Sequence, residues 1–203
     1  AQSLNKHFQP KGNNIDVCSN PEFLKEGSAV KDFFYPDRII LGATNNYSKS
    51  ILSKLYKPLK RKSNKFLFMS VESAELTKYA SNAFLATKIS FINEIALIAE
   101  KSNANIREVQ KGMGSDKRIG SEFLNAGLGF GGSCFPKDMK ALISYEKKHN
   151  IYNGIIENAL SVNENQIHLF AKKIKSFFGS SLKRQTFILW GLSFNPNTDD
   201  TRD

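Results

Sequence analysis

Hydrophobic residues in the middle of the chain recur at the spacing of an α-helix. From about Ser73 to Ser102 the sequence contains neither Gly nor Pro. The apolar positions that follow the helical repeat are Leu76, Tyr79, Ala80, Ala83, Phe84, Ile89, Ile92, Ile95, Ala96 and Ala99. Phe91 and Ile98 widen this stripe beyond one face, which predicts a long helix buried on several sides. Such a helix is typical of a subunit interface.

Shorter patterns on both sides predict alternating strands and helices. Strands are predicted at Ile15–Cys18, Arg38–Gly42, Lys65–Val71 and Gln185–Gly191. Asn20 can cap a short helix that starts at Pro21 and stops at Gly27. Further helices are predicted around Ser48–Leu59, Asn105–Lys111, Pro136–Lys148 and Tyr152–Phe178.

These elements predict a mainly α-helical central domain, with a long buried helix, flanked by partial α/β pieces. We assign residues 1–71 to one α/β domain, 72–182 to the helical domain and 183–203 to the start of another α/β domain. Because an α/β domain that opens with a strand at 185 cannot be complete by 203, we expect the chain to be a fragment of a longer protein.

Composition narrows the classes of protein further. The 203 residues are 40% hydrophobic and include 16 Phe, which is ample for a core and argues against global disorder. No run of about 18 apolar residues is found, so we expect no membrane span. The net charge of +10 comes without a DNA-binding signature, so we favour a solvated basic surface over nucleic-acid binding. The two Cys indicate no disulfide framework and favour a reducing cytoplasm.

One segment carries the clearest chemistry, the Gly-rich stretch from Gly129 to Asp138. Pro136 suits the first turn of a helix, which places Cys134 just before that turn. Free backbone N–H groups and the helix dipole favour a thiolate there, and Lys137 adds positive charge. The alternative is a small buried thiol in an ordinary turn. We therefore treat Cys134 as a candidate nucleophile.

Polar pairs at i,i+4 spacing supply candidate partners for this cysteine. Cys134 and Asp138 form one pair, and Lys78 and Asn82 form another on the long helix. Glu22 and Glu26 would share one face of the short helix after Asn20. Together these residues supply a nucleophile, a cation, an amide donor and carboxylates, which suits acyl-enzyme chemistry. The three His are far apart in sequence and indicate no metal site.

Several blocks occur in an order that resembles the UDP-glucose 6-dehydrogenases. The blocks are Asn20–Gly27, Glu75–Asn82, Arg118–Gly120, Gly129–Asp138, Gly191–Phe194 and Asp199–Arg202. The related GDP-mannose and UDP-N-acetylhexosamine dehydrogenases share the scaffold, but Arg118–Gly120 and Phe123–Gly127 are more similar to the UDP-glucose branch. The resemblance implies that residues 1–71 end a Rossmann-like NAD-binding domain and that 183–203 begin the UDP-sugar-binding domain.

The resemblance also implies a four-electron oxidation of a sugar primary alcohol to a carboxylate, with NAD as cofactor. Cys134 would trap the intermediate aldehyde as a thiohemiacetal, and a second oxidation would give a thioester that water hydrolyses. Lys78 and Asn82 would stabilise the oxyanion and move protons. Asp138 would position water or tune Cys134, and Glu22 would be the general base.

Binding residues follow from the same resemblance. It implies that a UDP-sugar is bound by Glu22, Phe23, Leu24, Lys78, Asn82, Arg118, Phe123, Leu124, Asn125, Ala126, Gly127, Gly131 and Asn195, and the cofactor by Glu26, Lys137 and Arg202. Arg118 would reach the sugar of a neighbouring subunit, which implies a homodimer built on the long helix.

The sequence departs from the family pattern in three respects. It contains no Lys-Ser-Thr segment, and it has no Gly-x-Gly-x-x-Gly fingerprint between a predicted strand and a helix; the one match to that spacing, Gly127–Gly132, follows no predicted strand. Asn195 stands where a lysine usually faces the substrate diphosphate, and an amide cannot supply that charge. We therefore expect this chain to be inactive by itself. The alternatives are a dehydrogenase for another nucleotide sugar and a non-catalytic dimerisation module.

Overall fold

The computed structural model describes residues 15–59, 65–151, 154–179, 181–193 and 198–201. The chain divides into two compact units. The first, called the N-terminal unit, comprises Ala1–Ala80 with Asn195–Thr198, and the second, called the central unit, comprises Ser81–Phe194 with Asp199–Asp203.

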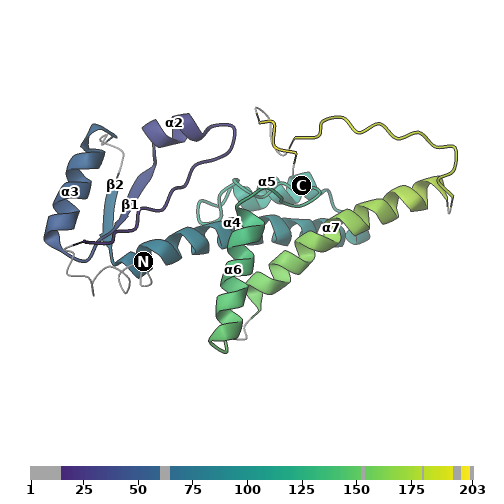
Figure 1. The fold of residues 1–203 in the computed structure, drawn as a ribbon. Helices are drawn as coiled ribbons and strands as arrows, with labels where there is room; N and C mark the ends of the chain where they lie inside the picture. Colours follow the sequence, from purple (N-terminus) through teal and green to yellow (C-terminus); the bar gives the residue numbers. More distant parts are fainter. Residues whose placement is uncertain (1–14, 60–64, 152–153, 180, 194–197, 202–203) are drawn as a thin grey trace. The chain divides into compact units, whose positions relative to one another are not determined.

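The N-terminal unit contains a parallel pair of strands. Strand β1 (Arg38–Gly42) and strand β2 (Lys65–Met69) pair in register from Arg38 with Lys65 to Gly42 with Met69 (Figure 1). Helix α3 (Asn46–Tyr56) and the 3-10 turn η2 (Lys57–Leu59) lie between them in the chain, and α2 (Ala29–Phe34) precedes β1. The apolar run of β1 is buried, and it forms the core of this unit.

The end of β1 packs very closely against the start of the long helix α4 (Val71–Ser102). A Cβ added at Gly42 would lie 2.8 Å from the Val71 Cα and 2.8 Å from the Ala74 Cβ. The helix begins here because the Ser70 hydroxyl accepts a hydrogen bond from the Ser73 N–H (3.1 Å). This cap ends the extended segment at Met69, two residues before the predicted strand end at Val71.

Two predictions near the start of the described chain are wrong. Residues 15–18 are irregular, and only Ser19 pairs with a strand, through an antiparallel bridge to Gly42. Residues 21–25 are also irregular, so no helix follows Asn20. The side chain of Asn20 is used elsewhere, since it donates to the Ile40 carbonyl (2.9 Å) and accepts from the Tyr56 hydroxyl. It therefore cannot cap a helix at Pro21.

Asp16 ties the same segment to α3. Its Oδ2 accepts hydrogen bonds from the Asn45 Nδ2 (2.8 Å) and the Ser48 hydroxyl (2.7 Å). The bond from Asn45 has the larger effect and that from Ser48 the smaller; together they hold the pKa of the Asp16 carboxyl below its usual range. Asn45 also caps α3 by accepting from the Ser48 N–H.

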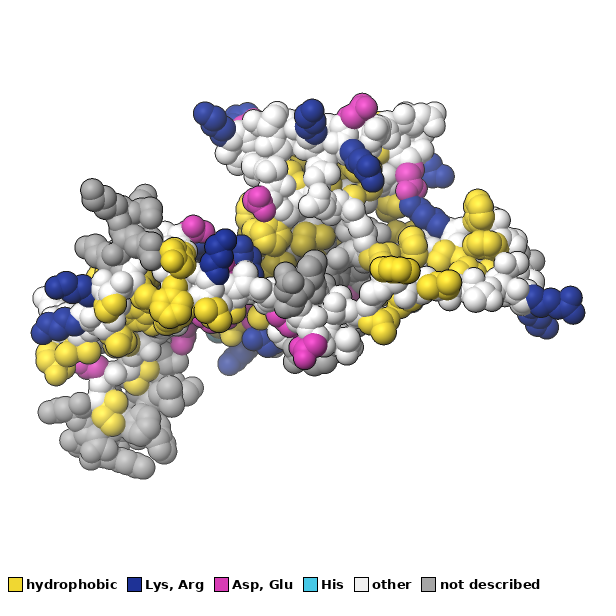
Figure 2. All heavy atoms as spheres, turned by 90° about the horizontal axis from the view of Figure 1, so that it is seen from above, with side chains coloured by type: hydrophobic (Ala, Val, Ile, Leu, Met, Phe, Trp, Pro, Cys, Tyr) yellow, Lys and Arg dark blue, Asp and Glu magenta, His cyan; other side chains and the backbone are white. Residues whose placement is uncertain are grey.

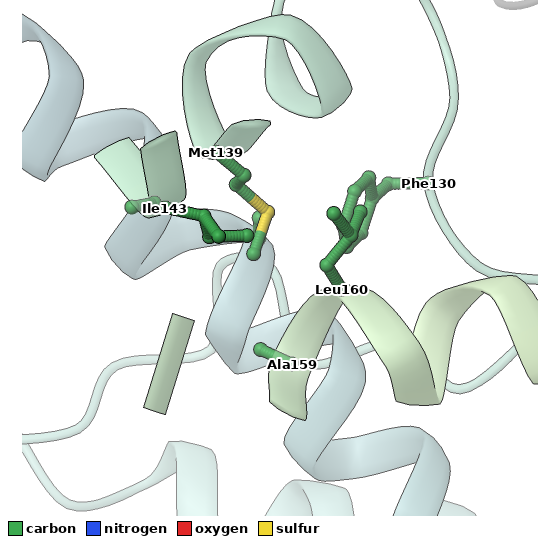
Figure 3. Packing of buried hydrophobic residues seen from close by; sticks show 7 residues of the cluster. Phe130, Met139, Ile143, Ala159 and Leu160 are labelled. Atoms are coloured by element: carbon green, nitrogen blue, oxygen red, sulfur yellow. The ribbon is translucent and has the colours of Figure 1, made fainter. Parts of the chain in front are cut away.

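The central unit is helical. It is built from most of α4, from α5 (Ile106–Gly114) and from the antiparallel pair α6 (Phe135–Lys148) and α7 (Ile155–Phe178) (Figure 1). Figure 3 shows Met139 and Ile143 of α6 facing Ala159 and Leu160 of α7, with Phe130 closing the cluster. Ala83 and Ala86 complete this core from α4, where small side chains allow a close approach.

The fold class predicted from the sequence is confirmed: the protein is mostly helical, with a long central helix and a small parallel β-pair. The observed α4 begins and ends within two residues of the prediction. The boundaries proposed for the three domains stay a prediction.

The long helix is less enclosed than its pattern indicates. Phe84, Phe91 and Ile98 are 66%, 48% and 56% exposed, whereas Ala86 and Ile92 are fully buried. Within the described part of the chain, α4 is also the one helix that is long and apolar enough to cross a membrane, by length and composition alone. A core helix of a soluble protein meets the same criteria, so this is weak support for a membrane span.

The predicted strand at Gln185–Gly191 is wrong, because residues 185–191 are irregular. No described segment hydrogen-bonds to them as a neighbouring strand, and an unpaired strand is not stable in water. Their apolar side chains are exposed, with Trp190 96% accessible.

On the face drawn in Figure 2, Lys and Arg are scattered and form no continuous basic surface.

Candidate active site

Cys134 lies directly before α6, as the position of Pro136 predicts. Cys134 is the N-terminal flanking residue of the helix and is half-buried. Its backbone carbonyl accepts the first helical hydrogen bond, from the Asp138 N–H (2.9 Å). The Ser133 hydroxyl lies 3.7 Å from the Cys134 Sγ. The thiol therefore stands at the positive end of the helix dipole, next to a hydroxyl that can exchange a hydrogen bond with it.

Asp138 is a buried carboxylate with two partners. Its residue is 3% exposed. The Asn82 amide on α4 donates to its Oδ2 at 2.7 Å, and the Lys137 Nζ lies 3.5 Å from its Oδ1. Each carboxylate oxygen is thus satisfied, which a buried charge requires. The pairing brings together two residues that are 56 positions apart in sequence.

A second polar pair lies in the N-terminal unit. The Lys78 Nζ is 3.2 Å from the Glu22 Oε1, and the Lys78 side chain is only 17% exposed. The Glu22 Oε2 accepts from the Leu24 N–H at 2.7 Å, which folds residues 22–24 into a local turn instead of a helix. The Lys78 Nζ also lies 5.4 Å from the centre of the Phe23 ring, which Arg38 approaches at 4.3 Å. Glu22 and Glu26 therefore do not share a helix face, and that prediction is wrong.

The Glu26 carboxylate binds another part of the same unit. Its Oε1 accepts from the Thr198 hydroxyl at 2.9 Å. Asn195 and Arg202, which the sequence places in the substrate and cofactor sites, lie outside the described residues. Their roles stay predictions.

Arg118 is exposed and held by a neighbouring carboxylate. Its Nη2 lies 2.5 Å from the Asp116 Oδ2, and its backbone N–H donates to the Asp116 Oδ1 (2.9 Å). The side-chain bonds from Arg118 hold the pKa of the Asp116 carboxyl below its usual range, and Asp116 raises the pKa of Arg118 in return. The guanidinium is thus a permanent charge, 89% exposed and aimed by a two-residue turn.

The loop between Phe123 and Gly131 contains the remaining predicted binding residues. Phe123 has a φ of 61°, and its ring lies 6.1 Å from that of Phe135. Leu124 is 1% exposed, so it anchors the loop in the core. The Asn125 Oδ1 accepts from the Gln110 side chain on α5 (2.6 Å). Ala126 and Gly131 are half-buried and Gly127 is exposed.

Two residues that were not predicted from the sequence hold this loop, Asn93 on α4 and Asn163 on α7. Asn93 accepts from the Gly127 N–H, and Asn163 binds both backbone polar groups of Phe130. Asn93 follows the apolar position Ile92, so an amide within the buried stripe was a usable signal. Among the described residues, no group of three or more His, Cys, Asp or Glu could hold a metal ion.

Comparison with known protein families finds two domains in this chain, in the order in which the sequence predicts them. Residues 1–60 match the NAD binding domain of the UDP-glucose/GDP-mannose dehydrogenase family, and residues 72–165 match its central domain. The chain therefore belongs to the UDP-glucose/GDP-mannose dehydrogenase family.

Individual relatives agree with this membership. The UDP-glucose 6-dehydrogenase of Rickettsia bellii is 47% identical over 196 residues, which is 97% of this chain and 45% of the relative. That of Pseudomonas aeruginosa is 46% identical over 93% of this chain and 42% of the relative. The structure of a UDP-glucose dehydrogenase from Pyrobaculum islandicum superposes with a TM-score of 0.87 at 40% identity, over 98% of this chain and 45% of that one. The chain spans less than half the length of these relatives.

Proposed function

We propose that the protein containing this chain oxidises the primary alcohol of UDP-glucose to a carboxylate in two steps, with NAD as the oxidant. The observation that carries the proposal is Cys134 at the start of α6, one helical turn before the buried carboxylate of Asp138. The relatives named UDP-glucose 6-dehydrogenase, at 46–47% identity, support UDP-glucose as the nucleotide sugar.

Cys134 supplies the covalent step. Its sulfur adds to the carbonyl carbon of the aldehyde made in the first oxidation, and the oxygen takes up a proton to give a thiohemiacetal. The second oxidation removes two electrons and two hydrogens to give a thioester. Water then attacks the thioester carbon, and the thiolate leaves to regenerate the cysteine. NAD, when bound, takes the electron pair of each oxidation.

The polar residues on α4 and Glu22 stabilise negative charge and transfer protons during the reaction. Asn82 and Lys78 stabilise the oxygen that becomes negative when sulfur or water attacks the carbonyl carbon. Glu22 takes the proton of the attacking water, and its contact with the Lys78 Nζ (3.2 Å) supports proton exchange between them. Asp138 orients water or Cys134 from a fixed position, since Asn82 and Lys137 hold both of its oxygens.

The cofactor fits the α/β part of the chain. Parallel strands bind dinucleotides beyond their carboxyl ends, and β1 and β2 both end at the same edge, at Gly42 and Met69. Glu26, Lys137 and Arg202 are the residues that we assign to the cofactor. Since no Gly-x-Gly-x-x-Gly follows a predicted strand in this sequence, as the dinucleotide fingerprint requires, we expect no turnover from these 203 residues alone.

The test is a substrate profile of the full-length protein that contains this chain. Formation of NADH is followed by absorbance with UDP-glucose, GDP-mannose and UDP-N-acetylglucosamine. We expect UDP-glucose to be preferred, with two NADH formed for each uronate because four electrons are removed. Preference for another nucleotide sugar would assign the chain to a different branch of the family. Reduction of NAD by the isolated 203-residue chain would contradict its predicted inactivity.

We also propose that the protein is a homodimer that pairs through α4. Phe84, Phe91 and Ile98 are exposed and spaced seven residues apart, which places them on one stripe of the helix, as at a helix–helix seam. A second subunit would remove this stripe from water and could bring the exposed Arg118 to its neighbour's sugar.

Replacing Phe91 by lysine should therefore convert the full-length dimer to a monomer, because an unpaired charge would be buried in the seam. The mass in solution, from light scattering after gel filtration, checks this. Ile167→Lys is the control, since Ile167 is also an exposed apolar residue (67% exposed) but lies on α7 instead of α4. A dimer that persists in Phe91→Lys but is lost in Ile167→Lys would move the interface to α7.

A further inference from the structure

The loop that leads to Cys134 is held by an amide side chain on α7. The Phe130 N–H donates to the Asn163 Oδ1 at 2.7 Å, and the Asn163 Nδ2 donates to the Phe130 carbonyl at 2.8 Å. One side chain therefore satisfies both backbone polar groups of Phe130. This two-point contact fixes the position of the backbone and also its orientation.

Gly129 allows the Asn163 side chain to come this close. Its φ is 107°, a conformation that L side chains rarely adopt, and a Cβ placed there would lie 2.4 Å from the Asn163 Oδ1. The glycine and the asparagine thus form a matched pair. Any side chain at 129 would displace the amide from Phe130.

A second amide holds the other end of the same loop. The Gly127 N–H donates to the Asn93 Oδ1 on α4 at 2.8 Å. Asn93 is 2% exposed, and its Nδ2 has no hydrogen-bond partner among the described residues. Leaving a buried donor unpaired costs free energy, so this orientation of Asn93 needs a compensating contact, and the bond to Gly127 supplies one.

The contact at Phe130 extends to the cysteine through packing. The Phe130 ring is buried, and its centre lies 5.8 Å from that of Phe135 in an edge-to-face arrangement. Phe135 is the first residue of α6 and follows Cys134 directly. A shift of Phe130 would therefore alter the packing of the residue bonded to the nucleophile.

We propose that Asn163 and Asn93 are positioning residues, which pin the loop at Phe130 and Gly127 so that Cys134 and the loop backbone are presented to the nucleotide sugar in a fixed geometry. This proposal rests on the proposed function. The two pins act at different places: Asn163 holds the part next to the nucleophile, and Asn93 holds the part assigned to substrate binding.

Hydrogen exchange in the full-length protein tests whether Asn163 holds the loop, and it requires no enzymatic activity. In Asn163→Ala, we expect backbone exchange in residues 129–134 to quicken at least about tenfold, because two hydrogen bonds are lost. Asn163→Asp keeps the acceptor for the Phe130 N–H and should retain most of the protection at that amide. Asn165→Ala is the matched control, since Asn165 lies on the same helix with an exposed side chain. Exchange in 129–134 that stays within about twofold of this control would overturn the proposal.

Kinetics separate positioning from a general loss of stability. Asn163→Ala should lower kcat for uronate formation at least about tenfold with little change in KM, because the nucleophile is displaced. Asn93→Ala should mainly raise KM for UDP-glucose. If exchange quickens equally throughout the protein, Asn163 is only a stabilising residue and the proposal fails. If the protein oxidises no nucleotide sugar, the proposed function and the catalytic role of Asn163 and Asn93 both fail. Hydrogen exchange in residues 129–134 still decides whether Asn163 holds the loop in place.

Discussion

Full-length protein carrying Cys134→Ser should produce uronate at a rate on the order of 10³-fold or more below that of the unaltered protein. The serine hydroxyl keeps the shape of the side chain but is a far weaker nucleophile than a thiolate, so the aldehyde is not trapped for the second oxidation. The helix start would be unchanged, because the hydrogen bond from Asp138 goes to the backbone carbonyl at 134. Stability should therefore be close to that of the unaltered protein.

The measurement is uronate by chromatography alongside NADH by absorbance. Cys18→Ser is the matched control, because Cys18 is the other free cysteine and is also half-buried. It should retain full uronate production. Undiminished uronate production by Cys134→Ser would remove the covalent intermediate from the mechanism.

Asn82→Asp should destabilise the protein by about 3–5 kcal/mol, because the buried carboxylate of Asp138 loses its amide partner and faces a second carboxylate instead. The substitution replaces the amide 2.7 Å from the Asp138 Oδ2 by a second carboxylate, and both residues are at least 93% buried. The remaining partner of Asp138 is Lys137, whose side chain is 71% exposed, so water screens much of its attraction. Urea denaturation monitored by circular dichroism measures the change in the free energy of unfolding.

The swapped pair Asn82→Asp with Asp138→Asn is the control for this prediction. It restores one carboxylate and one amide at the same contact, so at least about half of the lost stability should return. A double variant that is as unstable as Asn82→Asp would show that the loss comes from the position on α4 and has no connection with Asp138. The swap should still abolish activity, because the carboxylate then stands on the wrong helix.

The candidate site was partly predictable because some of it is local in sequence. Cys134, Pro136 and Asp138 lie within one helical turn, so residue type and spacing alone set their positions relative to one another. Lys78 and Asn82 share α4 for the same reason. Their roles stay predictions that the substitutions above are designed to test.

Glu22 shows where the local pattern misled. Asn–Pro before acidic residues is a helix-start signal, but Asn20 is bound to Ile40 and Tyr56, and the Glu22 carboxylate accepts from the Leu24 N–H. The carboxylate pairs with Lys78, which is 56 residues away. Contacts between distant parts of the chain override a weak local preference when they satisfy the same polar groups.

By itself, the sequence determined the long helix, strand β1 and the position of Cys134 directly before α6. Each of these depends on the local spacing of hydrophobic residues or on a residue that starts a helix. Only the tertiary structure decided that Asn82 meets Asp138, that Asn93 and Asn163 hold the loop before Cys134, and that residues 185–191 form no strand. A buried polar group must find a partner somewhere in the fold, and a strand must find a neighbour. Which residue provides the partner is settled by packing across the whole unit.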